Sequence, residues 1–174
     1  MPCQTAPKRL RPVLALLLGL AAPAGAAENA PTRIAVFAFE LDDFSGGAGI
    51  AGDAASDRRH LDEATDEARR LILANSRYAL VDVAPAAGEE VRTRTLYRCH
   101  GCEAEVARAL GADLSLVGVV TRISRTEFTL RIELRDARTG ELVMLRSSGL
   151  RMGADYAWSR GARSVVQQAF AEPQ

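Results

Sequence analysis

The chain of 174 residues is electrically balanced, with 22 basic and 22 acidic side chains, and 48% of its residues are hydrophobic. It has no basic block, which argues against a nucleic-acid partner, because such surfaces need clustered positive charge. Lys8 is the only lysine, so the rest of the chain lacks the amine that Schiff-base chemistry and P-loops require.

Residues 1–26 predict a secretory signal peptide that is removed on export. Three basic residues precede an apolar run at 13–22, which is too short for a membrane span of about 20 residues. Small residues lead up to the expected cleavage after Ala26, with cleavage after Ala27 as the alternative. Removal of this segment leaves 19 basic and 22 acidic residues. We therefore expect one secreted domain, residues 27–174, in the periplasm and without a membrane span.

The first half of this domain predicts a strand, a helix and a second strand. Residues 33–41 (RIAVFAFEL) are apolar on both faces of a strand, with Ile34, Val36 and Ala38 on one face and Ala35, Phe37 and Phe39 on the other. Such a strand is typical of the middle of an α/β sheet. A loop over 42–56 follows, and an amphipathic helix begins at Asp57. The next strand is expected at 78–83.

The second half predicts a short helix, three strands and a final helix. The short helix covers 103–110 and ends at Gly111, a residue suited to the turn after a helix. The three strands are expected at 113–123, apolar on both faces, at 128–135, apolar on one face, and at 142–150. Residues 136–140 (DARTG) form the hairpin turn between the last two strands, and Asp155 caps the final helix.

The resulting order, β-α-β-α-β-β-β-α, predicts an α/β (α+β) fold in a single domain. Strands connected through helices are expected to be parallel and central, whereas the pair joined by the hairpin is expected to be antiparallel and toward one edge. We therefore expect a mixed sheet with the helices packed on it.

Three stretches resemble a known family: residues 34–45 (IAVFAFELDDFS), residues 99–120 (CHGCEAEVARALGADLSLVGVV) and residues 158–161 (WSRG). The family consists of predicted secreted proteobacterial proteins of unknown function. Ala38 stands where the family has an aspartate, so no role of that aspartate is carried over. More distantly, the chain is similar to the amino-terminal domain of TolB and to α/β domains of envelope assembly lipoproteins. The resemblance implies an envelope or secreted protein as partner, with a quinoprotein dehydrogenase system as a possible setting.

Cys99 and Cys102 are the only cysteines beyond the signal peptide and are expected to form a disulfide in an oxidising compartment. The chain-entropy model gives about 2 kcal/mol for so small a loop. A redox-active pair at a helix start is the alternative. Glu103 stands where c-type haem attachment needs a histidine, and His60 and His100 do not complete a convincing zinc site. We expect no metal and no cofactor.

Five side chains are candidates for binding. Glu40, Asp42 and Asp43 lie at the end of the first strand, where open α/β sheets bind ligands. The other two, Trp158 and Arg160, lie on the last helix, where core packing is the competing interpretation for the tryptophan. The glycine motif at 47–52 matches the dinucleotide fingerprint in letters but is separated from the strand and from the helix, so we expect a plain loop.

The residues supply no catalytic set, so we expect no enzyme. The favoured function is a non-catalytic binding or assembly module that acts on another envelope or secreted protein. A thiol–disulfide protein using Cys99 and Cys102 is the first alternative, and a small-ligand binder at the strand ends is the second.

Overall fold

The computed structural model describes residues 30–45, 54–124, 127–151 and 157–171. The expected signal peptide with its cleavage site, the glycine motif at 47–52 and the expected cap at Asp155 lie outside the described residues. The elements are, in chain order, β1 (Thr32–Val36), β2 (Glu40–Asp43), α1 (Ala54–Leu73), β3 (Tyr78–Val81), α2 (Glu89–Thr93), the 3₁₀ helix η1 (Leu96–Arg98), α3 (Cys102–Ala109), β4 (Leu114–Arg122), β5 (Glu127–Asp136), β6 (Leu142–Arg151) and α4 (Ala157–Phe170).

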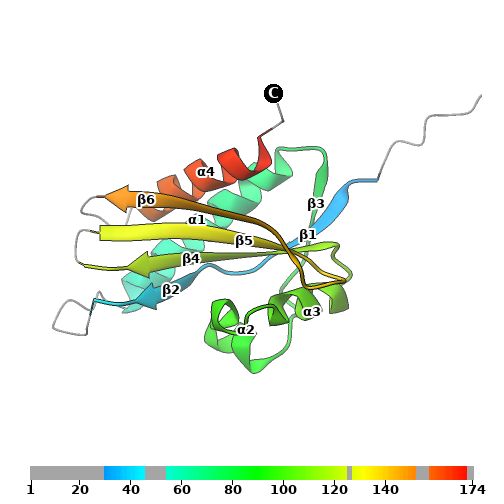
Figure 1. Ribbon diagram of the computed structural model, residues 1–174, viewed down its shortest axis with the longest axis horizontal. Helices are drawn as coiled ribbons and strands as arrows, with labels where there is room; N and C mark the ends of the chain where they lie inside the picture. Colours follow the sequence, from blue (N-terminus) through cyan, green and yellow to red (C-terminus); the bar gives the residue numbers. More distant parts are fainter. Residues whose placement is uncertain (1–29, 46–53, 125–126, 152–156, 172–174) are drawn as a thin grey trace, which may run out of the picture.

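One mixed sheet organises the molecule (Figure 1). Its strand order is β3-β1-β4-β5-β6, and β2 pairs with β4 beyond the end of β1. The pairs β1–β3, β1–β4 and β2–β4 are parallel, whereas β4–β5 and β5–β6 are antiparallel. The predicted fold class, with parallel strands joined through helices and a hairpin toward one edge, is confirmed.

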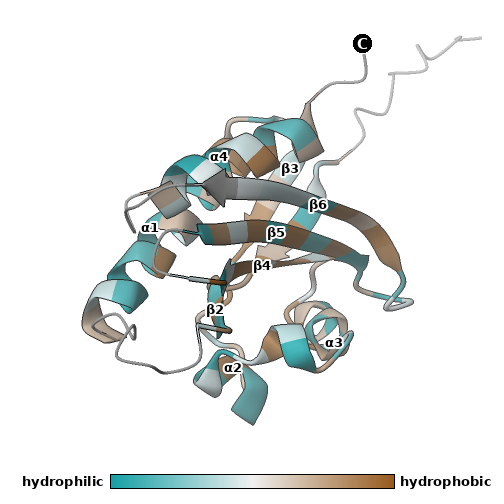
Figure 2. Ribbon diagram, turned by 60° about the vertical axis from the view of Figure 1, so that its left-hand side comes forward, coloured by the Kyte–Doolittle hydropathy of each residue, from teal (hydrophilic) through white to brown (hydrophobic). Residues whose placement is uncertain are grey.

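Helices cover the two faces of the sheet unequally. The pair α1 and α4 packs on one face, and α2, η1 and α3 lie on the other (Figure 1). The buried stripe of α1 includes the small residues Ala64 and Ala68, and α1 packs against α4. Both helices show hydrophilic residues on other sides (Figure 2). The larger core lies between these two helices and the sheet, and includes Ile34, Val36, Phe39, Leu116, Leu130, Ile132 and Trp158.

The alternation of the sequence matches the burial of the strands. Residues 116–120 of β4 are all buried, as expected for a strand covered on both faces. Along β5 the apolar residues from Phe128 to Leu134 are buried and their neighbours are partly exposed. Gly111 has a φ of 78° and follows α3, where its N–H and that of Ala112 donate to carbonyls of the last helical turn.

The structure differs from the sequence-based expectation at the first strand, which is interrupted. Val36 is opposite Leu116 and Glu40 is opposite Val119, so residues 37–39 face only two residues of β4. This one-residue excess is a bulge, and it reverses the faces of every residue that follows. The prediction that Phe39 shares a face with Phe37 is therefore wrong: Phe39 packs in the α1–α4 core, on the face of Ile34 and Val36, and Phe37 packs in the opposite core.

A second difference concerns residues 84–101, for which the sequence predicts no helix and no strand. They contain α2 and η1, which are too short to show a clear helical period. Both lie on the α3 face of the sheet, directly before the disulfide.

Candidate functional site

The bulge in the first strand is held by two side chains of α1. An extra residue leaves backbone groups without a partner in the sheet, and buried groups of this kind need one. The Phe39 amide donates to Thr65 Oγ1 at 2.8 Å, and Arg69 Nη2 donates to the Val36 carbonyl at 2.9 Å. Thr65 and Arg69 are four residues apart and therefore lie on the same side of the helix.

Gly118 of β4, the strand that pairs on both sides of the bulge, makes room for the Phe39 ring. A Cβ at this glycine would lie 2.4 Å from three atoms of that ring, closer than real Cβ contacts. The bulge thus depends on the absence of a side chain in β4 as well as on α1. Because the bulge shifts the strand by one residue, Glu40 and Asp42 lie on the sheet face that carries α2 and α3, whereas Asp43 lies on the face that carries α1.

Glu40 is almost completely buried, with 1% of its surface exposed. Its carboxylate accepts hydrogen bonds from the amides of Leu96, at 2.9 Å, and Tyr97, at 3.1 Å, at the start of η1. Desolvation of the charged form outweighs these bonds and raises the pKa of Glu40. The side chain therefore anchors η1 to the sheet and does not open to solvent.

Asp42 lies on the same face and contacts two side chains of η1. The Tyr97 hydroxyl donates to Asp42 Oδ1 at 2.9 Å, and Arg98 lies 3.7 Å from the same carboxylate oxygen. Burial and the bond to Asp42 together raise the pKa of Tyr97. Two of the three candidate acids, Glu40 and Asp42, thus bind the η1 segment that precedes the disulfide.

The third acid, Asp43, belongs to a buried cluster centred on Arg122. Arg122 is 3% exposed; its Nη1 lies 3.0 Å from Asp43, and its Nη2 donates to Asp57 at the start of α1. Its guanidinium also lies over the rings of Phe128 and Trp158, at 5.6 and 5.8 Å from their centres. Although burial favours neutral Asp43, hydrogen bonds from Ser45 and Arg122 hold its pKa below the ordinary value.

The two candidates on α4 are placed apart by the structure. Trp158 has no exposed surface and packs against Phe128 and His60, with ring centres 5.5 and 6.1 Å away. Arg160 lies exposed on the surface of α4. Trp158 is therefore part of the core beside Arg122, whereas Arg160 lies on the surface.

Cys99 and Cys102 are joined by a disulfide with a Cα–Cα distance of 5.6 Å. Cys99 ends η1 and Cys102 begins α3; between them Gly101 has a φ of 128°, a conformation that favours glycine. Both cysteines are half-buried and pack against the core on this face. Among the described residues, Glu103 completes a group of three possible metal ligands with them, but sulfur atoms bonded to each other offer no thiolate. Glu103 instead pairs with Arg135 at 2.8 Å.

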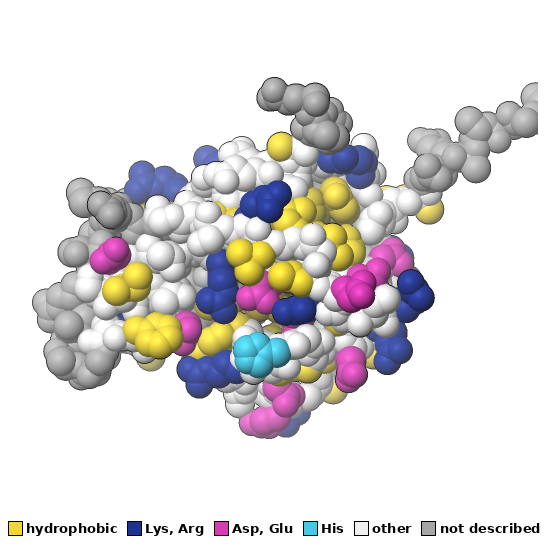
Figure 3. Space-filling view, viewed as in Figure 1, with side chains coloured by type: hydrophobic (Ala, Val, Ile, Leu, Met, Phe, Trp, Pro, Cys, Tyr) yellow, Lys and Arg dark blue, Asp and Glu magenta, His cyan; other side chains and the backbone are white. Residues whose placement is uncertain are grey.

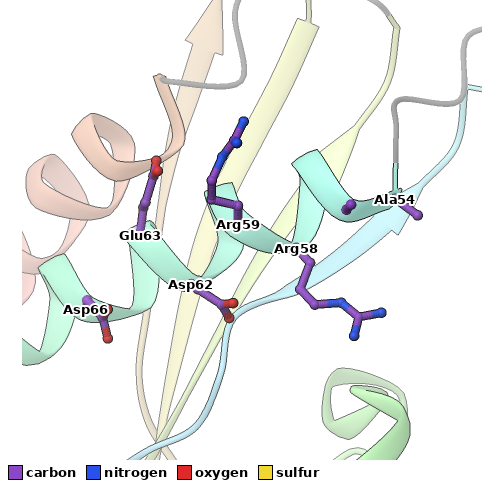
Figure 4. Close-up of a pocket in the computed structure, with 7 residues that line it drawn as sticks. Ala54, Arg58, Arg59, Asp62, Glu63 and Asp66 are labelled. Carbon is purple, nitrogen blue, oxygen red and sulfur yellow. The ribbon is translucent and has the colours of Figure 1, made fainter.

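A groove of about 500 Å³ runs along the outer side of α1 (Figure 4). Arg59 and Glu63 project to one side of the helix, and Arg58 and Asp62 project to the other. Asp62 also pairs with Arg94 at 2.6 Å. Because these side chains diverge and carry both signs of charge, we assign no ligand to the groove.

Sequence reasoning missed two features of this end of the sheet. One is Arg122, whose partners Asp43 and Asp57 lie 79 and 65 residues away and leave no local signal. The other is an exposed apolar pair, Phe44 and Ile123, with 68% and 44% of their surfaces exposed. Phe44 lies in the segment that is expected to be a loop, and a phenylalanine among small and acidic residues is the sequence signal for it.

Together, the fold and the site define a small α/β module in which the acids at the strand ends hold structural elements together. The chain belongs to a protein family of unknown function: the profile of DUF3280, described as "Protein of unknown function (DUF2380)", matches residues 32–170. The membership in a family of unknown function that residues 34–45, 99–120 and 158–161 predict is thereby confirmed. No curated protein matches the chain. Within the described ranges, no helix has both the length and the apolar character that a membrane span needs.

Several solved structures are similar to the chain at low sequence identity. The LpoB C-terminal domain from Salmonella enterica is 16% identical, with a TM-score of 0.49, over 71% of this chain and 84% of that one. The PelC dodecamer from Paraburkholderia phytofirmans is 16% identical, with a TM-score of 0.41, over 82% and 85%. TolB from Acinetobacter baumannii, to which the sequence pointed, is 9% identical, with a TM-score of 0.46, over 81% of this chain and 28% of TolB. At these TM-scores and identities, the likenesses assign no role to the chain.

Proposed function

We propose that this protein is an exported module of the bacterial envelope that binds another protein and catalyses no reaction. One observation carries the proposal: the side chains best suited to catalysis or ligand binding already contact other groups within the described structure. Glu40 binds backbone amides, Asp43 binds Arg122, and Cys99 is joined to Cys102. Acids and thiols used in this way hold a scaffold, and a small-ligand site at the strand ends would have to displace these contacts.

The exposed apolar pair at the ends of β2 and β4 is the surface that we assign to the partner. Asp43 is opposite Arg122 in the sheet, so Phe44 and Ile123, which follow them, are neighbours. The Phe44 amide donates to the Arg122 carbonyl at 2.8 Å, which ties the backbone under the pair to the buried cluster. Large apolar side chains on a rigid support are typical anchors of protein interfaces.

Photo-crosslinking in cells tests this assignment. A photoreactive phenylalanine analogue at position 44 should give one adduct of defined mass, and the same analogue at Glu105, exposed on α3, should not give that adduct. The Ile123→Ser variant should weaken the adduct, whereas Leu73→Ser, which removes an apolar residue 59% exposed on α1, should leave it unchanged. Identical adducts at positions 44 and 105, or none at position 44, would refute the proposal. The identity of the adduct also tests the quinoprotein dehydrogenase setting.

The disulfide supports one second candidate, a thiol–disulfide protein. Cys99 and Cys102 are half-buried and not fully enclosed, so a partner thiol could reach the bond. Accelerated disulfide exchange in a reduced test protein, lost in the Cys99→Ser variant, would favour this function over the binding module.

A further inference from the structure

Strand β6 forms one edge of the sheet and carries exposed apolar residues. It is ten residues long and pairs with β5 on one side; within the described residues no strand pairs with its other side. Leu142, Val143 and Leu145 have 46%, 56% and 46% of their surfaces exposed. The beginning of β6 is correspondingly hydrophobic in Figure 2, and hydrophobic side chains gather over β5 and β6 in Figure 3. An unpaired strand edge of this kind is a template for another strand.

The sequence at the start of β6 is complementary to itself. Residues 141–146 read ELVMLR, with an acid at one end, a base at the other and apolar residues between. When two such segments run antiparallel about an axis between Val143 and Met144, Glu141 of each copy lies opposite Arg146 of the other. The same register places Leu142 opposite Leu145 and Val143 opposite Met144. A two-fold interface requires this reciprocity, in which residue i meets residue j and j meets i.

The register of β6 within the sheet places the side chains on matching faces. Leu142 is opposite Arg135 and Leu145 is opposite Glu133, so both leucines point to the same face of the sheet. Residues three apart share a face here because the β5–β6 pairing shifts between Leu134 and Arg135. Directly opposed residues in antiparallel strands share a face, so the two leucines would meet across the axis.

Glu141 and Arg146 also project to one face of the sheet, the face opposite to that of the two leucines. Arg146 is opposite Ile132, whose side chain points to the α1–α4 core. The Asp136 amide donates to the Glu141 carbonyl at 3.0 Å, which places Glu141 opposite Asp136. Asp136 is an even number of residues from Ile132, so Glu141 and Arg146 project to the same side. Within the described residues, no ion pair involves either of them, so both are available to a second copy.

We propose that two copies of this chain associate edge to edge through residues 141–146 of β6 and form one continuous sheet across a two-fold axis. The contact lies at the opposite end of the sheet from Phe44 and Ile123, because the start of β6 is beside the end of β5 and the start of β4. Self-association therefore leaves the proposed partner surface open, and either proposal can fail without the other.

Charge exchange in the purified full-length mature protein tests the dimer. Sedimentation equilibrium should show a concentration-dependent dimer for the unmodified chain. Glu141→Arg and Arg146→Glu should each raise the dimer dissociation constant at least about tenfold, because like charges then face each other twice. An equimolar mixture of the two variants should restore dimers, since both pairs are again of opposite charge in the mixed species.

A matched control is Arg138→Glu, which reverses an exposed charge in the hairpin turn outside the segment and should leave the dissociation constant unchanged. Circular dichroism should show that each variant is folded, as expected for changes at exposed positions. A chain that stays monomeric at all concentrations reached, or a dimer insensitive to both charge reversals, overturns the proposal. Restoration of dimers in the mixture supports the two-fold register. If dimers return neither in the mixture nor in the double variant Glu141→Arg/Arg146→Glu, that register is wrong.

Discussion

Thr65 of α1 accepts the backbone N–H of Phe39 at 2.8 Å and donates its own hydroxyl proton to the Leu61 carbonyl at 2.7 Å. A helix side chain thereby replaces the hydrogen bond that the sheet cannot make at the bulge. The arrangement determines which face Glu40, Asp42 and Asp43 take, because the bulge shifts the strand by one residue.

Thr65→Val should destabilise the protein by about 1–3 kcal/mol, because a nearly isosteric side chain leaves the buried Phe39 amide without an acceptor. Thr65→Ser retains the hydroxyl and should cost clearly less. Urea unfolding followed by circular dichroism measures both. Equal losses in the two variants would show that the methyl group matters and the hydrogen bond does not.

Gly118→Ala should destabilise the protein by about 1–3 kcal/mol through overpacking against the Phe39 ring. The matched control is Gly149→Ala in β6, where an added Cβ would meet no heavy atom within 4 Å. A second change, Phe39→Leu, should recover part of the loss in the Gly118→Ala background but not in the control. Thermal unfolding of the four variants decides the point, and equal effects at Gly118 and Gly149 would contradict the close approach.

Glu67 should make stability depend on pH. Hydrogen bonds from Arg70, and then from Arg163 of α4, lower its pKa from 4.5 to about 2. A lowered pKa means that the folded state favours the carboxylate, so its contribution is present above pH 4.5 and is lost as the pH falls toward 2.

The Glu67→Gln variant should therefore be less stable than the unmodified protein at pH 7, and the difference should shrink between pH 4.5 and 2. Arg163→Met removes one partner and should show the same trend. Urea unfolding at a series of pH values checks this, and a difference that does not change with pH would argue against the ionic contact.

Replacement of both Cys99 and Cys102 by serine should lower the melting temperature modestly and leave the fold intact. The closed loop is small, and the chain-entropy model gives about 2 kcal/mol for it. A bond that serves structure should resist glutathione, with a potential below about −300 mV. Calorimetry and redox titration measure the two quantities, and easy reduction would favour the thiol–disulfide function.

Export should produce a mature amino terminus at Ala27, or at Glu28 if cleavage follows Ala27. The charge layout and the short apolar run of residues 1–26 are the reason. Intact-mass measurement of protein from the periplasmic fraction checks the cleavage point. Recovery of a species that retains Met1 in the membrane fraction would refute the prediction.

Much of the fold could be predicted because strands and helices differ in hydrophobic period. Residues 128–135 alternate cleanly, and the structure confirms a strand with one buried face. The bulge could not be predicted for a specific reason: residues 33–41 are apolar on both faces, so a shift of one residue leaves the pattern unchanged. For the same reason the sequence could not assign Glu40 to the η1 side of the sheet.

The candidate site shows the same division between local and distant information. The proximity of Cys99 and Cys102 follows from their spacing, since four consecutive residues in a tight turn stay close whatever the rest of the chain does. Arg122 is buried only because two acids converge on it from distant segments. A charge at this depth is tolerated only when it is paired, and pairing over such separations is a property of the packed molecule.

The sequence by itself determined the element order, the mixed sheet and the nearness of the two cysteines, since each depends on period, turn chemistry or short spacing. Only the tertiary structure decided the bulge at residues 37–39, the burial of Arg122 and the exposure of Phe44 and of the β6 edge. These features depend on which side chains from remote segments meet across the sheet, and burial is a property of that assembly and not of any single stretch of chain.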